Sequence, residues 1–368
     1  MNSEQLMAQA LKLASRGRYT TQPNPMVGCI ITKNNQIIGK GWHQSYGSDH
    51  AEVNAIKNCK KKYGSKQATK LLKGSHVYVN LEPCSITNNT PPCIDALLQI
   101  GVQEVTCGTL DPNPRINGKG VRALRKNGVK VSVGVLRKEC ESLNRIFFTN
   151  QKKQRPYIIL KGAQSIDGKI ALKSGQSKWI TNDASRKDAH KTRALVKGIL
   201  VGKKTIEHDN PNLDMRLSAQ ELGLTKNAPT PQPIKIILGS PSSNWNAKNI
   251  LSGGTAVIVA ANQFARKIKN AECIQYKKKD FLAELMNELL TKDITSVLVE
   301  GGAKTLNGFM SKGLFDELVL YTAPIMMGRE SISAFNLKAP TLVSEAQKLS
   351  LEKLEIFHED IKVTYLNK

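Results

Sequence analysis

Near the N-terminus, His50, Glu52, Cys84 and Cys93 have the types and the spacing of a catalytic zinc site. The imidazole and the two thiolates can supply three ligands of a tetrahedral zinc ion, and a fourth position left to water is typical of catalytic sites. Zinc lowers the pKa of a bound water towards neutrality. Glu52 can carry the water proton without binding the metal, because it follows the histidine by two residues. The pattern predicts hydrolytic chemistry, with Glu52 as the catalytic residue.

The neighbouring sequence supplies elements that can position these side chains. Asp49 is suited to cap a helix over 50–60, whose first turn would point His50 and Glu52 into one cleft. The strand-like run 76–81 leads directly into the segment that contains Cys84. A helix over 92–99 would carry Cys93 on its first turn, where the helix dipole favours a thiolate. The alternative, that these are unconnected buried residues, does not account for this placement.

The rest of the first part alternates between strands and helices. An Asn34-Asn35 pair between two apolar runs predicts a hairpin. The predicted helices are 4–14, 118–126 and 138–148, and the predicted strands are 27–32, 36–41, 104–108 and 129–133. This alternation indicates an α/β domain with a mixed sheet.

A polar stretch that ends in proline, 151–156, is the best candidate for a linker. The length of 368 residues fits two domains, which we expect at 1–150 and 151–368. A second α/β pattern follows the stretch. Its predicted strands are 157–162, 198–201, 234–238, 255–260, 296–300, 318–322 and 361–366, and its predicted helices are 183–196, 280–290 and 304–312.

The composition limits the classes of function. The sequence shows no N-terminal apolar h-region and no apolar run long enough for a membrane span, so we expect a cytoplasmic protein. Seven scattered cysteines favour metal or core roles over a disulfide framework. The formal net charge is +24, but Lys supplies 41 of the 54 basic residues and Arg only 13. A phosphate-reading surface would favour Arg, so we expect no nucleic-acid partner. We attribute most of the charge to compositional drift towards a Lys-rich surface and a smaller part to phosphorylated small substrates.

The zinc motif resembles a known family. The order H-x-E followed by P-C is the signature of zinc nucleobase deaminases. Eight residues, 85–92, separate Cys84 from Cys93 here, where P-C-x-x-C is the common form. With Pro91-Pro92-Cys93 closing this loop, the motif resembles the deaminase half of the bifunctional riboflavin-biosynthesis deaminase–reductases. The resemblance implies a cytidine-deaminase-like zinc domain, with Asn24 and His43 at the substrate.

The second half resembles the reductase half of the same family, which has a dihydrofolate-reductase-like fold and uses NADPH. The resemblance is carried by a series of short motifs in order. They are Lys161-Gly162-Ala163, Ser165-Ile166-Asp167-Gly168-Lys169, Ser177-Lys178-Trp179-Ile180-Thr181, Asp209-Asn210-Pro211-Asn212-Leu213, Arg216 and Glu300-Gly301-Gly302. Together the two resemblances cover nearly the whole chain.

The resemblance implies a role for individual residues of the second half. Gly301 and Gly302 would let backbone N–H groups approach a phosphate at a helix N-terminus. Arg193 and Arg216 suit bidentate capture of the substrate phosphate. The implied substrate-binding residues are Ser177, Arg193, Leu213, Arg216 and Glu300. The implied cofactor-binding residues are Ala163, Trp179, Thr205, Asp209, Gly301 and Gly302, and Asp209 is also the acidic catalytic residue near the reacting sugar carbon.

The implied activity is hydrolytic deamination of a diamino-ribosylaminopyrimidinone 5′-phosphate, followed by NADPH-dependent reduction of its ribosyl group to ribityl. We expect a homo-oligomer. Two departures from the family pattern bear on this activity: 86–89 in the zinc loop and Lys203-Lys204 near the expected cofactor site. Two alternatives stay open, a tRNA or polynucleotide deaminase with an unrelated C-terminal half and a binding or scaffold protein without turnover. The first predicts salt-dependent RNA binding without NADPH, and the second predicts no activity in either half.

Overall fold

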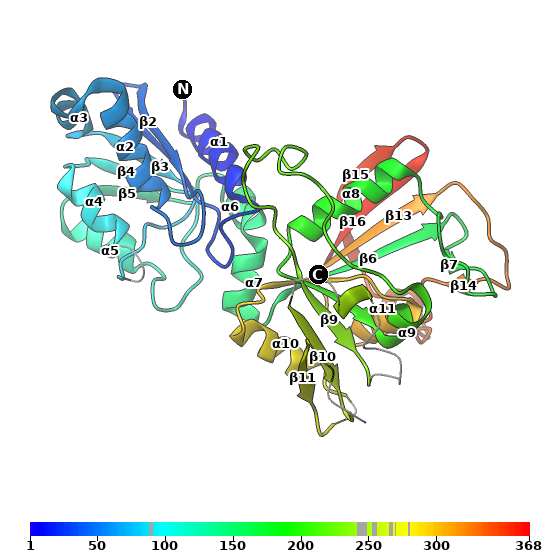
Figure 1. Cartoon of the computed structure of the whole chain (residues 1–368). Helices are drawn as coiled ribbons and strands as arrows, with labels where there is room; N and C mark the ends of the chain where they lie inside the picture. Colours follow the sequence, from blue (N-terminus) through cyan, green and yellow to red (C-terminus); the bar gives the residue numbers. More distant parts are fainter. Residues whose placement is uncertain (88–90, 241–248, 252–255, 265–267, 269, 279) are drawn as a thin grey trace. The chain divides into compact units, whose positions relative to one another are not determined.

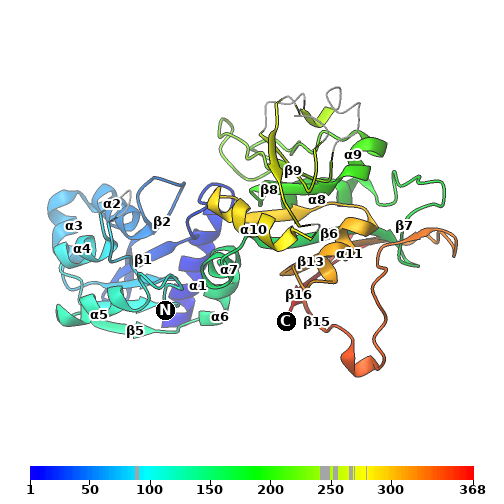
Figure 2. The same cartoon turned by 90° about the horizontal axis from the view of Figure 1, so that it is seen from below.

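Gln154 and Arg155 mark the place where the chain passes from one folding unit to another, Met1–Gln154 and Arg155–Lys368 (Figures 1 and 2). The computed structural model describes residues 1–87, 91–240, 249–251, 256–264, 268, 270–278 and 280–368. Each unit has its own sheet and its own core. Within the described residues, no helix is both long enough and apolar enough to cross a membrane.

The first unit is built on a five-stranded mixed sheet. In spatial order its strands are β2 (Gln36–Trp42), β1 (Gly28–Lys33), β3 (His76–Val79), β4 (Glu104–Cys107) and β5 (Lys130–Val133). β1 runs antiparallel to β2 and β3, and β3, β4 and β5 run parallel. Asn34 and Asn35 both have left-handed backbones, with φ of 49° and 60°, which suits the predicted two-residue hairpin turn.

Helices cover both faces of this sheet (Figure 1). One face packs against α2 (Ala51–Tyr63), α3 (Ser65–Leu72), α4 (Cys93–Gln99) and α5 (Lys119–Lys126), and the other against α1 (Ser3–Ala14) and α6 (Arg137–Leu143). A short helix η1 (Ser15–Gly17) follows α1. Gly28 and Gly41 allow close packing, because a Cβ at Gly28 would lie 2.0 Å from the Ala10 carbonyl oxygen and one at Gly41 would lie 2.3 Å from that of Ala51.

One expectation for the end of this unit is wrong. The helix predicted over 138–148 is two helices, α6 and α7 (Arg145–Lys153), with a break at Asn144. The Asn144 side chain accepts from the Met26 N–H at 2.7 Å and donates to its carbonyl at 2.9 Å, which ties the break to the start of the sheet. The boundary between the two units falls within the predicted linker 151–156, although its first three residues complete α7 and Arg155 is buried.

The second unit contains a nine-stranded sheet and a small two-stranded one. In spatial order the large sheet has β11 (Glu272–Gln275), β10 (Val257–Ala261), β9 (Ile234–Leu238), β8 (Gly198–Gly202), β12 (Ser296–Val299), β6 (Tyr157–Ser165), β13 (Glu317–Ala323), β16 (Asp360–Asn367) and β15 (Leu349–Phe357). Neighbours are parallel from β11 to β13, whereas β16 and β15 pair antiparallel. The small sheet pairs β7 (Lys169–Ala171) with β14 (Ile332–Ser333).

Both faces of the large sheet are covered. α10 (Leu282–Thr291) and α11 (Ala303–Met310) pack on one face. α9 (Lys203–Asp209) and the turn η3 (Asn249–Leu251) pack on the other. The Tyr321 hydroxyl and the Lys362 ammonium both bond to Asp188 of α8 (Asp183–Ala194).

The sequence analysis did not predict α3, α9, β7, β11, β14 and β15, nor the turn η4 (Val343–Glu345). Most of these are short segments for which local pattern is a weak guide. The predicted strand 255–260 begins at Thr255, which lies outside the described residues.

Candidate active sites

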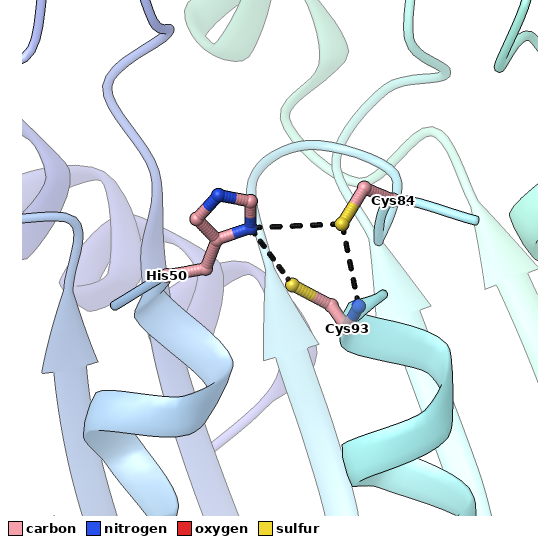
Figure 3. A group of neighbouring side chains, drawn as sticks. All are labelled: His50, Cys84 and Cys93. Atoms are coloured by element: carbon pink, nitrogen blue, oxygen red, sulfur yellow. Dashed lines mark hydrogen bonds between the residues drawn. The ribbon is translucent and has the colours of Figure 1, made fainter. Parts of the chain in front are cut away.

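The first site brings His50, Cys84 and Cys93 together from three elements (Figure 3). His50 is the N-terminal cap of α2, Cys93 begins α4, and Cys84 lies on the loop after β3. His50 Nδ1 lies 3.0 Å from Cys93 Sγ and 3.6 Å from Cys84 Sγ, and the Cys93 N–H points to Cys84 Sγ at 3.3 Å. All three ligand atoms lie within 4.8 Å of one another, so they can reach one metal ion.

One detail differs from the expectation for this site. His50, not Asp49, occupies the cap position of α2, and the Asp49 carboxylate pairs with Lys57 instead. Cys84 and Cys93 share a hydrogen bond, which moves the pKa values of the two thiols in opposite directions. Hydrogen bonding from Cys93 and His50 lowers the pKa of Cys84 to about 4, whereas the bond to Cys84 and burial raise the pKa of Cys93.

Glu52 lies in the first turn of α2 and is buried. Burial and the nearby Cys84 thiolate raise the pKa of its carboxyl group. Its Oε2 atom has no hydrogen-bond partner within the described residues. A buried carboxylate oxygen without a partner is costly, and such groups call for a functional explanation. A proton carrier that meets a water or a substrate would supply one.

The donor set fits zinc. One imidazole nitrogen and two thiolates are typical zinc ligands, and three protein ligands leave a position for water. Asn24 and His43 lie beside this set. His43 Nδ1 lies 3.1 Å from the Asp49 carbonyl oxygen and His43 Nε2 lies 3.2 Å from Asn24 Nδ2, while the His43 and His50 rings are 5.4 Å apart. Burial lowers the pKa of His43, which keeps the ring neutral.

Glu82 supports the site, and the sequence analysis assigned it no role. Its buried carboxylate accepts N–H groups from Asp111 at 3.1 Å, Gly118 at 2.8 Å and Val121 at 3.1 Å. It thereby ties the loop that carries Cys84 to the start of α5. The only signal in the sequence was an acidic residue two positions before the cysteine. Asn88 and Asn89 of the altered zinc loop lie outside the described residues.

In the second unit, Arg193 and Glu300 form a buried, two-pronged ion pair. Arg193 Nε and Nη2 donate to the two Glu300 oxygens at 2.9 and 2.8 Å, and Nη1 donates to the Asp214 carbonyl at 3.0 Å. Burial alone would raise the pKa of Glu300, but the charges of Arg193 and Lys161 lower it to about 2. Among the residues that the structure describes, Arg193 therefore uses three of its five N–H groups on protein partners, which leaves two for a ligand.

Arg216 and Leu213 lie on the irregular segment after α9. The Arg216 side chain is exposed, and its backbone N–H donates to His190 Nδ1 at 3.3 Å. Leu213 is buried and has a left-handed backbone with φ of 58°. The structure thus brings Arg193, Arg216 and Glu300 close to one another. The charges of all three affect the pKa of the nearby His190.

Four of the proposed cofactor residues lie at the carboxyl ends of central strands of the large sheet. β8, β12 and β6 are adjacent and parallel, and Thr205, Gly301 and Gly302 follow two of their carboxyl ends. Ala163 lies towards the same end of β6. A Cβ at Gly302 would meet nothing within 4 Å, so the N-terminus of α11 is open to a phosphate. The open N-terminus of α11, beside the carboxyl ends of these strands, fits the phosphate groups of NADPH.

The other proposed cofactor residues are less closely gathered. Trp179 is 74% exposed, and the Arg186 guanidinium lies 4.3 Å from its ring centroid. Asp209 is the exposed last residue of α9, and the proposed substrate residue Ser177 is half-buried on the loop of Trp179. Lys203 pairs with Glu207 at 3.7 Å.

Comparisons with known proteins agree with both sites. Residues 1–109 match the family of the cytidine and deoxycytidylate deaminase zinc-binding region, and residues 156–363 match the RibD C-terminal domain. Fold and site therefore define a two-part protein in which a cytidine-deaminase-like zinc domain precedes a RibD reductase domain. The match to the second half excludes the alternative of an unrelated C-terminal half.

Similarity extends over the whole chain. The riboflavin biosynthesis protein RibD of Aquifex aeolicus is 37% identical over 98% of this chain and 97% of its own length, and that of Escherichia coli is 35% identical over 98% of both. The chain belongs to the RibD family. Solved structures agree: Acinetobacter baumannii RibD and a diaminohydroxyphosphoribosylaminopyrimidine deaminase/5-amino-6-(5-phosphoribosylamino)uracil reductase from Thermotoga maritima each have a TM-score of 0.86 and 31% identity, covering 100% of this chain and 99% of theirs.

Proposed function

We propose that the protein is a bifunctional enzyme of riboflavin biosynthesis. It removes the 2-amino group of 2,5-diamino-6-(5-phosphoribosylamino)pyrimidin-4(3H)-one and then reduces the ribosyl group to ribityl with NADPH. The observation that carries the proposal is the zinc-ligand cluster beside a buried Glu52, in a chain that matches RibD proteins from end to end. The deaminase is assigned to residues 1–150 and the reductase to residues 151–368.

In the deaminase, His50, Cys84 and Cys93 would hold one zinc ion, which supplies a Lewis acid and a nucleophilic water at neutral pH. Glu52 would accept a proton from the attacking water and deliver it to the amino group, which would leave as ammonia. The raised pKa of Glu52 suits this exchange, because a less acidic carboxyl group holds the proton more readily before it passes it on. Asn24 and His43, bonded to each other, orient the pyrimidine.

In the reductase, bound NADPH supplies the hydride that goes to C1′ of the sugar. Gly301 and Gly302 would receive cofactor phosphate through backbone N–H groups, and Ala163, Trp179, Thr205 and Asp209 complete the cofactor site. The protein's own contribution is alignment of the two reactants.

The substrate-binding residues of the reductase are assigned to two parts of the substrate, its phosphate and its sugar. Arg216 and the free N–H groups of Arg193 would hold the phosphate, and Glu300, held by Arg193, would meet the sugar. Ser177 and Leu213 complete the set, and Asp209 is the acidic residue near the reacting carbon.

The proposal extends to assembly and location. We expect a cytoplasmic homo-oligomer that acts on a small phosphorylated pyrimidine and not on nucleic acid or a membrane. Leu351, Leu354 and Ile356 are exposed on β15, which is an edge strand of the large sheet. Exposed apolar edges of this kind favour association, which supports the oligomer.

A turnover assay tests the function. The diaminopyrimidinone phosphate is supplied with NADPH, and ammonia release and NADPH oxidation are followed separately. Both are expected, with ammonia appearing first, and NADPH oxidation should also occur when the deaminated intermediate is supplied. Ammonia release without NADPH oxidation would refute the assignment of the reductase activity. Absence of both would refute the proposed function as a whole.

A further inference from the structure

The segment 213–216 carries two proposed substrate residues and has a strained backbone. Leu213 is a buried leucine with a φ of 58°, in the left-handed region that residues with a side chain rarely adopt. Strained backbones persist only where neighbouring contacts determine them. The contacts of this segment therefore reveal which residues set the position of Arg216.

Three side chains hold the middle of the segment. Gln232 accepts from the Met215 N–H at 3.0 Å and donates to the Met215 carbonyl at 2.8 Å. Lys235, which is 1% exposed on β9, lies 2.8 Å from an Asp214 carboxylate oxygen. Arg193 donates to the Asp214 carbonyl. These contacts fix Asp214 and Met215 but do not touch Arg216.

His190 supplies the contact at Arg216. The Arg216 N–H donates to Nδ1 of His190 at 3.3 Å. His190 precedes Arg193 by three residues on α8, so the two side chains lie on one face of that helix. One helical face thus holds Glu300 through Arg193 and the Arg216 backbone through His190.

The surroundings keep the His190 ring neutral. Burial, followed by the positive charges of Arg193 and Arg216, lowers the pKa of His190 to about 4. Glu300 opposes this effect, and Lys161 adds to it. A neutral ring carries one N–H, and because Nδ1 accepts, the proton lies on Nε2. A lysine or arginine here has no lone pair with which to accept the Arg216 N–H.

We propose that His190 is a positioning residue of the reductase. Its Nδ1 fixes the backbone at Arg216 so that the guanidinium is presented to the anionic group of the substrate. The identity of that substrate rests on the proposed function, whereas the hydrogen bond does not.

Three substitutions separate the two ring nitrogens. His190→Asn keeps an acceptor at the position of Nδ1, His190→Gln places its amide near the position of Nε2, and His190→Leu keeps neither. Since a net hydrogen bond contributes about 0.5–1.5 kcal/mol and a tenfold change in KM corresponds to about 1.4 kcal/mol, His190→Gln and His190→Leu should raise the substrate KM by up to about tenfold. His190→Asn should retain nearly the wild-type KM. In all three the kcat and the KM for NADPH should stay near wild type. His358→Asn, at an exposed histidine, is the matched control.

A double-mutant cycle tests whether His190 acts through Arg216. In an Arg216→Ala background, His190→Leu should raise the KM no further, because the guanidinium that it positions is gone. Additive losses would overturn the proposal. The proposal would also be overturned if His190→Gln, and not His190→Asn, kept the wild-type KM. A fall in kcat at unchanged KM in these variants would overturn it as well.

Nitrogen-15 NMR of the six histidines tests the hydrogen bond without turnover. The signal lost in His190→Asn should be that of a neutral ring with its proton on Nε2, unchanged from pH 8 to about 5 because the pKa is about 4. A neutral ring with its proton on Nδ1 overturns the proposal, because Nδ1 could then not accept the Arg216 N–H. If the wild type fails to reduce the substrate but this signal is found, the proposed function fails and the hydrogen bond stands.

Discussion

Glu52 combines burial, a raised pKa and a carboxylate oxygen without a hydrogen-bond partner in the part of the chain described. Glu52→Gln should keep zinc, because the three ligands are unchanged, but should lower deamination by about 10²–10⁴-fold, the usual contribution of a general acid–base. Metal analysis and ammonia release check the two effects. NADPH oxidation with the deaminated intermediate serves as the internal control. If both activities fell together, the loss would reflect misfolding and not proton transfer.

Arg193 and Arg216 differ in their surroundings, and their substitutions should differ as well. Arg216→Ala removes an exposed guanidinium, so it should raise the KM for phosphorylated substrate by about 10–100-fold, at about 1.5–3 kcal/mol for a charge-assisted bond. Dephosphorylated substrate and thermal stability should be little affected.

Arg193→Ala should penalise both substrates and lower the melting temperature, because it leaves Glu300 as an unpaired buried charge. Kinetics with phosphorylated and dephosphorylated substrate, beside thermal unfolding, check this contrast between the two arginines. The contrary result would be an Arg193→Ala protein that has wild-type stability and a raised KM for the phosphorylated substrate only. It would show that Arg193 is mainly a phosphate ligand.

At the scale of elements, the loop that carries Cys84 depends on Glu82. Glu82→Ala would leave three buried N–H groups without their acceptor, and each costs about 1–3 kcal/mol. The free energy of unfolding of the first unit should therefore fall by about 3 kcal/mol or more. Denaturant unfolding checks this, with Glu139→Ala at an exposed site of α6 as control. Similar losses in the two variants would contradict the anchoring role.

The sequence predicted most of the elements that carry the sites. The strand 234–238 has the predicted bounds, and the predicted fold class is confirmed by the family matches. His50, Cys84 and Cys93 could be singled out because metal chemistry restricts both residue type and spacing.

Supporting residues could not be found in this way, because their roles depend on partners distant in sequence. Lys235 is one case: a lysine within a strand suggests a solvent-facing position, yet both faces of this sheet are covered and Lys235 pairs with Asp214. His190 is another, since nothing local to α8 indicates that its ring meets the Arg216 backbone.

For the whole molecule, the metal site and the reductase residues belong to separate units, each with its own core. Cys84→Ala should therefore abolish zinc binding and ammonia release, because two ligands hold zinc far less well than three. Reduction of the deaminated intermediate should continue. Cys273→Ala, at a cysteine of β11 in the second unit, is the control. Zinc retained at wild-type level in Cys84→Ala would refute the ligand assignment.

The connection between the units is very short. α7 ends at Lys153, Gln154 follows with a left-handed backbone, and Arg155 is already buried against Asp316 at 2.6 Å. A protease needs an exposed, extended segment, and this connection offers almost none. The two lysines before it are helical, and the bond after Arg155 leads into a proline, which trypsin cleaves poorly. Limited digestion should therefore cut elsewhere first. It should not release the two units as separate intact fragments, so separating the two activities would require expressing the units from divided genes.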